Sequence, residues 1–117
     1  MVYHLLLLKD SPTLDPEARR RLVGAFEHAI REIPTVRRVH LTKRIRVGTN
    51  YEGQMPDIAD FAIIIEFDDV SGLQMYLQHP AHEELGRRFS GAVDSPLILD
   101  FESVGLNSLR EPPQAPT

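Results

Sequence analysis

Residues 60–82, DFAIIIEFDDVSGLQMYLQHPAH, decide how this chain can fold. Their first part predicts a strand with two apolar faces, because successive strand residues point to opposite sides. One side carries Phe61, Ile63, Ile65 and Phe67, and the other carries Ala62 and Ile64. Antiparallel sheets usually alternate apolar and polar residues, since one face meets water. This strand is therefore expected at the centre of a sheet that is covered on both faces.

The second part of the segment predicts two short helices separated by a break. Asp68 or Asp69 is expected to cap the first helix. His79-Pro80 ends it, because proline disfavours helical geometry in the residue before it, and Pro80 can begin the second helix. The expected apolar sides are Val70, Leu73 and Leu77 on the first helix, and His82, Leu85 and Phe89 on the second.

The residues before this segment predict another strand and a longer helix. The strand, Val2–Leu8, is again apolar throughout. Asp15 suits an N-cap, Pro16 suits the first helical position, and Ile33-Pro34 ends the helix. Its apolar stripe consists of Leu22, Phe26, Ala29, Ile30 and Ile33.

Two further strands and two irregular segments complete the chain. Residues 36–47 alternate well enough to predict a strand, with Val39, Leu41, Ile45 and Val47 on one side. Residues 48–59 hold two glycines and a proline among polar residues, and predict a long loop of the kind that often forms a lid. Residues 97–101 predict the last strand, and residues 105–117 a flexible, proline-rich tail.

This order of elements predicts an α+β fold, the ferredoxin-like βαββαβ arrangement, with an antiparallel sheet and helices on one face. Residues 1–104 are expected to form one domain. The first and third strands are central in this topology, and they are the two strands without a polar face. Because the helices can cover only one face, we expect a homodimer in which two sheets face each other.

The composition narrows the class of protein. The 117-residue chain is 42% hydrophobic and 26% charged, as in soluble globular proteins. Its net charge of −4 argues against nucleic acid as a partner, and the absence of cysteine excludes disulfides and thiolate sites. The leucine run at residues 5–8 is too short to span a bilayer and lacks the flanks of a signal peptide. We therefore expect a cytoplasmic protein with no membrane partner.

Tyr76 and His82 are the best candidates for chemistry. His82 shares the apolar side of its helix, and an imidazole exchanges protons near neutral pH. The Tyr76 hydroxyl could donate a hydrogen bond to a developing enolate or carbonyl oxygen. The alternative is architectural: His82 could bond a backbone carbonyl and stabilise the helix break.

Two other histidines leave their roles open. His79 stands directly before Pro80, where it suits a helix cap as well as a ligand contact. His4 would line a pocket if it pointed into the dimer interior, and would be a core histidine if it pointed to the helices. The spacing of these histidines is not diagnostic of a metal site, so we expect neither metal nor cofactor.

Several of these features resemble the Dabb family, the stress-responsive dimeric α/β-barrel proteins. The most specific is YLQHPAH at residues 76–82. The others are His4 before a leucine-rich strand, the Ile33-Pro34 helix end, and the strand end Glu66-Phe67-Asp68-Asp69. The resemblance covers about residues 2–102 and implies a ferredoxin-like dimer whose two sheets form a barrel, with a cavity in each protomer.

One branch of this family, olivetolic acid cyclase, closes a linear polyketide by an aldol step without a cofactor. The resemblance implies that Tyr76 and His82 are catalytic and that His4 lies in the pocket. Phe61 stands where that branch has a further pocket histidine, which argues against the cyclase reaction itself. We expect Phe61, Leu6 and His79 to contact a ligand as well.

Three functions remain open. The first is a barrel that binds a small hydrophobic or phenolic ligand and catalyses cofactor-free proton transfer, in the manner of a cyclase or isomerase. The second is a non-catalytic structural or ligand-binding stress protein, and the third a cofactor-free monooxygenase. An enclosed cavity between Tyr76 and His82 would favour the first. The second would be favoured if that space were filled by Phe61, Ile63, Leu6 and Leu8.

Overall fold

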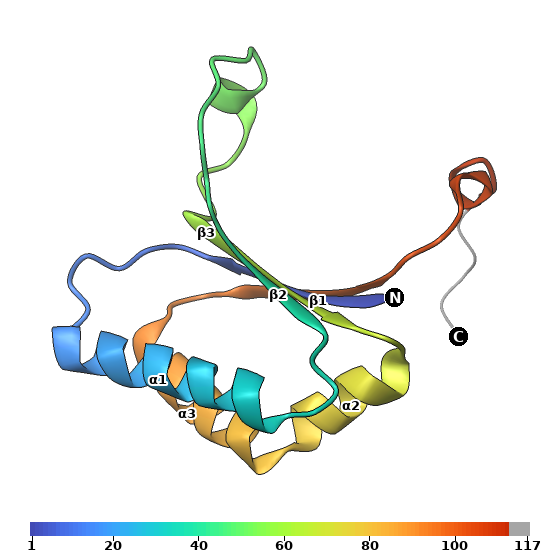
Figure 1. Cartoon of the computed structure of the whole chain (residues 1–117). Coiled ribbons are helices and arrows are strands. Elements are labelled where there is room, and N and C mark those ends of the chain that lie inside the picture. Colours follow the sequence, from blue (N-terminus) through green and yellow to red (C-terminus); the bar gives the residue numbers. More distant parts are fainter. Residues whose placement is uncertain (113–117) are drawn as a thin grey trace.

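The computed structural model describes residues 1–112 and contains one four-stranded antiparallel sheet (Figure 1). The elements in chain order are β1 (Val2–Leu8), α1 (Pro16–Glu32), β2 (Arg38–Lys43), β3 (Phe61–Phe67), α2 (Val70–Gln78), α3 (Pro80–Ala92) and β4 (Leu97–Glu102). The strand order is β2-β3-β1-β4, which places β1 and β3 at the centre. The predicted ferredoxin-like α+β fold is confirmed.

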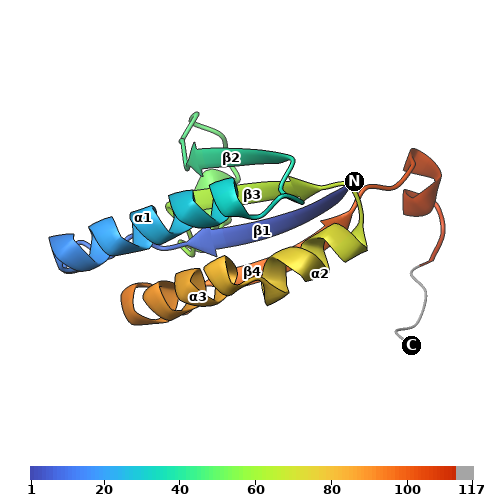
Figure 2. The same ribbon diagram turned by 60° about the horizontal axis from the view of Figure 1, so that its bottom comes forward.

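All three helices lie on one face of the sheet, and the other face carries none (Figure 2). The register of β1 with β3 pairs His4 with Ile65 and Leu5 with Ile64, so these two pairs point to opposite faces. His4 and Ile65 are buried under the helices, while Leu5 and Ile64 keep partial exposure. No helix within residues 1–112 has the length and apolar character needed to cross a membrane.

We call the face without helices the open face. The strand registers place twelve side chains on it: Tyr3, Leu5, Leu7, Arg38, His40, Thr42, Ala62, Ile64, Glu66, Leu97, Leu99 and Phe101. Eight of these twelve residues are aromatic or aliphatic, and each keeps contact with solvent in the single chain. The sheet thus has an apolar surface on both sides, and the helices bury only one of them.

The helix ends agree with the predicted capping residues. The Asp15 carboxylate accepts a hydrogen bond from the Ala18 backbone N–H at 3.2 Å, and Pro16 is the first residue of α1. Asp69, rather than Asp68, caps α2 and accepts from the Gly72 N–H at 2.9 Å. His79 ends α2 and also caps α3, because its Nδ1 accepts from the Ala81 N–H at 3.0 Å.

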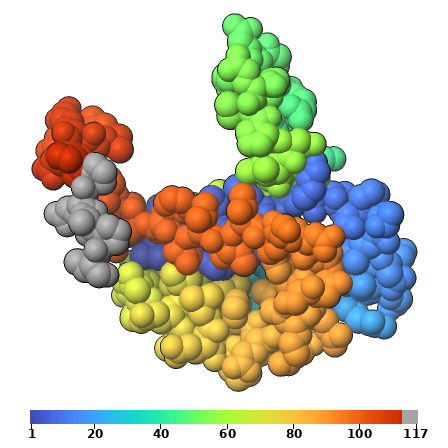
Figure 3. Space-filling model, turned by 180° about the vertical axis from the view of Figure 1, so that it is seen from behind, coloured from blue at the N-terminus to red at the C-terminus, as the bar shows by residue number. Residues whose placement is uncertain are grey.

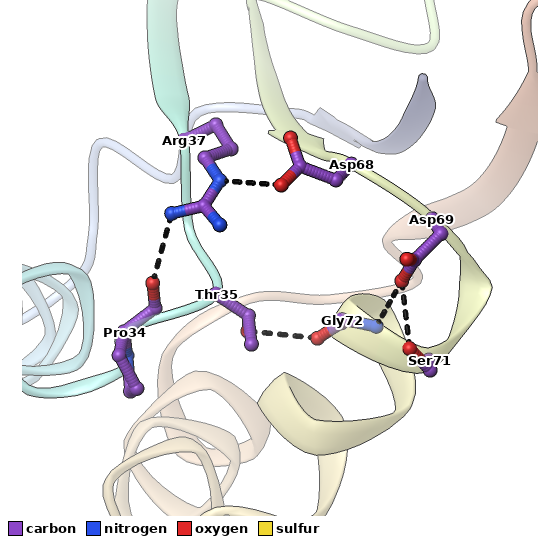
Figure 4. Close-up of polar contacts among 7 residues, drawn as sticks. All are labelled: Pro34, Thr35, Arg37, Asp68, Asp69, Ser71 and Gly72. Atoms are coloured by element: carbon purple, nitrogen blue, oxygen red, sulfur yellow. Dashed lines mark hydrogen bonds and ion pairs between the residues drawn. The ribbon is translucent and has the colours of Figure 1, made fainter.

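A set of polar contacts joins the turn after α1 to the turn after β3 (Figure 4). The Thr35 hydroxyl donates to the Gly72 carbonyl at 2.8 Å, and the Arg37 guanidinium pairs with Asp68 at 2.8 Å. A Cβ on Gly72 would lie 3.4 Å from the Thr35 Cβ, at ordinary van der Waals distance, so the two segments pack in direct contact. These contacts fix the start of α2 and hence the position of Tyr76 on it.

The second strand is shorter than the predicted range of residues 36–47. β2 ends at Lys43, opposite the first residue of β3, and one further backbone bond joins Arg44 N–H to the Asp60 carbonyl. Beyond that point no neighbouring strand remains to pair with. Leu41 and Ile45, which were predicted to share one side of the strand with Val39, are 68% and 76% exposed.

The predicted apolar side of α2 is also partly wrong. Leu73 is buried as expected, but Val70 and Leu77 are exposed, and Tyr76 takes their place in the core. The reason is geometric: Tyr76 follows Leu73 by three residues, and the ring packs against Phe67 of β3 with centroids 5.2 Å apart.

The chain between β2 and β3, residues 44–60, forms an arm that rises on the side of the open face (Figure 1). A single 3₁₀ turn, Glu52–Gln54, lies in it, where a loop was predicted. The Glu52 carboxylate accepts bonds from the Val47 N–H at 2.7 Å and the Thr49 N–H at 3.2 Å. At the base, Lys9 pairs with Asp57 at 2.7 Å. The arm therefore has a defined shape.

The chain after β4 also rises on the side of the open face (Figure 3). It holds a second 3₁₀ turn, Leu106–Leu109, within the range predicted to be a flexible tail. Residues 113–117, the rest of that predicted tail, lie outside the described residues. Val104, Leu106 and Leu109 are exposed, as are Ile45, Val47, Tyr51, Met55 and Ile58 on the arm.

We expect Ile65→Ala to lower the free energy of unfolding by about 2–5 kcal/mol, because it leaves a cavity in the centre of the core. Ile65 is fully buried on β3, between the sheet and the helices. Val23→Ala on the exposed side of α1 is the matched control and should change stability by less than about 0.5 kcal/mol. Urea denaturation measures both, and equal effects would contradict this description of the core.

Candidate functional site

Three of the predicted site residues meet on the helix side of the sheet. The Tyr76 ring lies between two imidazoles, with its centroid 4.8 Å from that of His82 and 5.7 Å from that of His4. Tyr76 comes from α2, His82 from the first turn of α3, and His4 from β1. The break at His79-Pro80 brings Tyr76 and His82 together. Only His79 separates the end of α2 from the start of α3, and the chain changes direction there (Figure 2).

His4 points to the helices, which decides between the two orientations left open by the sequence. Its side chain is 4% exposed, and its Nδ1 lies 2.6 Å from the Asp100 carboxylate on β4. A carboxylate only accepts, so the His4 Nδ1–H donates to it. Asp100 is 45% exposed, and the pair therefore runs from the core to the edge of the sheet.

The Tyr76 hydroxyl is a neutral group with an unused hydrogen-bonding capacity. Burial raises the pKa of Tyr76 to about 12, so it keeps its proton at neutral pH. No hydrogen bond to it is present within residues 1–112, and no side-chain polar atom there is both fully buried and unpartnered. Since the residue is 2% exposed, its hydroxyl retains a narrow contact with solvent.

His82 is held in its neutral form at neutral pH. Burial lowers the pKa of His82 below its ordinary value of 6.5, and nearby His4 lowers it further. The Leu77 carbonyl and Glu83 oppose this shift without reversing it. A half-buried, neutral imidazole beside an unpartnered phenol can accept a proton while the phenol donates a hydrogen bond.

The other predicted ligand contacts lie apart from this cluster. The Nδ1 of His79 is occupied as the cap of α3. Leu6 packs against the buried core, opposite Ile63 of β3. Phe61 lines a hollow at the base of the arm, together with residues such as Met55 and Ile58. The structure therefore brings together His4, Tyr76 and His82, and does not bring Phe61 or His79 to them.

The cluster offers no donor set for a metal. Within the part of the chain that the structure describes, no three histidine or carboxylate side chains converge as metal ligands. His4 is committed to Asp100 and His79 to its cap. The arrangement can instead donate one hydrogen bond, from the Tyr76 hydroxyl, and accept one proton, at His82.

Two carboxylates that were not predicted as site residues pair with histidines. Asp100 pairs with His4, and Glu66 pairs with His40 on the open face at 2.5 Å. Glu66 is the single acidic residue of FAIIIEF, and Asp100 lies inside LILDFE, which is otherwise apolar up to its last residue, Glu102. A lone carboxylate in such a strand needs a partner, and this was the signal available.

Comparison with solved structures supports the fold, and some of the similar proteins are described as dimeric. A protein of Arabidopsis thaliana superposes with a TM-score of 0.70 at 22% identity, over 91% of this chain and 98% of its own. A dimeric ferredoxin-like protein of unknown function from Thermobifida fusca gives 0.63 at 18%, over 86% and 88%. Hydroxynitrile lyase from Passiflora edulis gives 0.69 at 13%, over 86% and 90%. At these identities the likeness shows the fold alone.

A search of curated proteins finds no match to this sequence. A family model, in contrast, does match it. Residues 2–103, nearly the whole described chain, match the stress responsive A/B barrel domain, Dabb. The match includes all four strands, the three helices and the cluster of His4, Tyr76 and His82. The chain is thus a member of the Dabb family.

Proposed function

We propose that this protein is a homodimer that binds a small, largely apolar molecule and transfers a proton on it. In this account, Tyr76 donates a hydrogen bond to a carbonyl oxygen of the ligand, and neutral His82 takes a proton from the neighbouring carbon and returns it. The observation that carries the proposal is the Tyr76–His82 contact. The ring centroid of Tyr76, whose hydroxyl has no hydrogen-bond partner, lies 4.8 Å from that of His82, whose pKa is lowered.

The homodimer is supported by the shape and chemistry of the open face. Its apolar side chains are too many to leave in water, and neighbouring folds such as that of Thermobifida fusca are described as dimeric. The arm and the segment after β4 both rise on the side of this face and carry exposed apolar residues (Figure 3). A second copy seated between them would cover all three surfaces.

We expect the chain to have twice its own mass in solution, and Leu99→Lys to reduce it to the monomer, because a charge among the apolar side chains of the open face would lose its hydration on association. Leu99 lies opposite Leu5 in the middle of β4. Val23→Lys, the same kind of change on the outer side of α1, should leave the dimer intact. Light scattering after size-exclusion chromatography measures this, and a monomeric wild type would contradict it.

The proton-transfer role is supported by the distribution of charge in the cluster. Tyr76 stays protonated and His82 stays neutral, so a donor and a base coexist at neutral pH. The His4–Asp100 pair, held at 2.6 Å, fixes the ring behind Tyr76. Hydroxynitrile lyase of Passiflora edulis, which shares the fold, is named for a reaction on small molecules, and this likeness makes a small-molecule reaction a reasonable hypothesis here.

A non-catalytic role for the same residues is the second candidate. The observation that favours it is burial: His4 and Tyr76 are almost inaccessible, and the core beside them includes Ile65, Phe67 and Leu85. In that case Tyr76 and His82 would hold α2 and α3 on the sheet. The same experiment separates the two roles.

We expect the wild type to accelerate deuterium exchange at C2 of benzoylacetone in D₂O, because this carbon lies beside a carbonyl. His82→Gln should lower the acceleration by 100-fold or more, and Tyr76→Phe by about tenfold or more. His79→Asn is the control, since asparagine also caps helices. NMR follows the exchange. An exchange rate equal to that without protein would favour the architectural role.

We expect His82 to titrate below pH 6.5 in the folded protein, as measured from its ring proton shifts by NMR. The folded pKa is lower than the unfolded one, so protonation favours unfolding, and stability from this residue falls as the pH drops through about 6.5. A reaction that needs neutral His82 should therefore stay constant from pH 7.5 to about 6.5 and decline only in more acidic solution. A pKa of His82 above 6.5 would contradict this.

A further inference from the structure

The open face holds a second imidazole–carboxylate pair, separate from the helix-side cluster. His40 on β2 and Glu66 on β3 both point away from the helices, and His40 Nε2 lies 2.5 Å from Glu66 Oε2. The Glu66 side chain is only 15% exposed, although no helix covers it. A carboxylate in such apolar surroundings is expensive unless it is paired, so this pair is a built feature of the face.

The pair borders a hollow on the open face. The hollow measures about 460 Å³ and is lined by Tyr3, Leu5, His40, Thr42, Ile64 and Phe101. This size falls within the range of about 300–1,000 Å³ of small-molecule sites. Two aromatic rings and two aliphatic side chains form its walls, and the polar groups lie at one side, on β2.

The hydrogen bonds already made on that side determine what the hollow can recognise. The Glu66 carboxylate accepts, so His40 Nε2 is the donor, and in the tautomer with its proton on Nε2 the other ring nitrogen, Nδ1, is an acceptor. The Thr42 hydroxyl donates to the Ala62 carbonyl at 2.7 Å, which leaves only its acceptor capacity. The β2 side of the hollow thus offers acceptors. Only the Tyr3 hydroxyl, which has no partner within residues 1–112, adds a group that can donate or accept.

We propose that this hollow binds a small aromatic molecule that carries a hydroxyl group, that is, a phenol, whose O–H donates to the acceptors on β2. The carboxylate of Glu66, which is bonded to the His40 ring in the wall of the hollow, disfavours a carboxylate ligand there, and its cross-strand neighbour Arg38 does not line the hollow. The aromatic and aliphatic walls bury the ring of the ligand. The site lies on the opposite side of the sheet from Tyr76 and His82, since His40 and Ile64 point away from the helices.

This site rests on the proposed dimer. In the single chain the hollow is open to solvent, and a second copy seated on the open face would close it. A closed hollow removes water from the ligand and strengthens the hydrogen bond to it. The phenol would then lie in the space between the two sheets.

Ile64 and Ile65 allow a direct test, because these neighbours point to opposite sides of β3. The probe is 4-ethylphenol, added to the wild type labelled with ¹³C at the isoleucine methyl groups. We expect nuclear Overhauser effects between the ring protons of the probe and the Ile64 methyl, and none to the Ile65 methyl. Effects to Ile65 alone would place the phenol on the helix side and overturn this inference, while leaving the proton-transfer proposal standing.

Affinity measured by calorimetry tests the hydrogen-bond argument. We expect 4-ethylanisole, which lacks the O–H, to bind about tenfold more weakly than 4-ethylphenol, and 4-ethylbenzoate not to bind. His40→Phe should weaken 4-ethylphenol about tenfold, and His28→Phe, the same change at an exposed position of α1, should not. If His40→Phe fails to fold, Thr42→Val removes another acceptor and should weaken binding several-fold.

Light scattering on the same samples separates the two proposals. A dimer that shows no binding of 4-ethylphenol, or equal binding of 4-ethylanisole, overturns this inference alone. A wild type that is monomeric at the concentrations used overturns both the dimer and the closed site. A dimer with contacts to Ile64 and a preference for the phenol supports both.

Discussion

The sheet of this protein has apolar side chains on both faces and a single layer of helices. The helices bury Val2, Ile65 and Phe67, and leave Leu5, Ile64 and Leu99 facing solvent. Removing about 600 Å² of such apolar surface from water contributes about 15 kcal/mol before opposing terms. That is large enough to offset the loss of freedom on association, about 4–15 kcal/mol. These magnitudes support the proposed coverage of the open face by a second copy.

The two-residue period of the strands sets two different chemistries back to back. On β1, His4 faces the helices and reaches Asp100, while Tyr3 lines the hollow on the open face. On β3, Ile65 joins the core, while Glu66 pairs with His40 on the other side. The helix side holds an unpartnered phenol and a neutral imidazole, which suits proton exchange. The open face holds acceptors in an apolar wall, which suits the binding of a donor.

The sequence predicted features that depend on neighbouring residues and missed those that depend on distant ones. Asp15, Pro16 and the His79-Pro80 break act within one turn, and their roles were predicted correctly. The His4–Asp100 pair joins residues 96 positions apart, and the face on which His4 lies follows from strand register, which no local pattern gives. The early end of β2 depends likewise on where β3 begins.

The most direct test of the covered open face is an isotope-filtered NMR experiment on a sample that mixes ¹³C-methyl-labelled and unlabelled chains. The filter retains only contacts between different copies. We predict such contacts for the methyl groups of Leu5, Ile64 and Leu99, and none for Val23 on the outer side of α1. Intermolecular contacts confined to the helices, or none at all on the open face, would contradict the account.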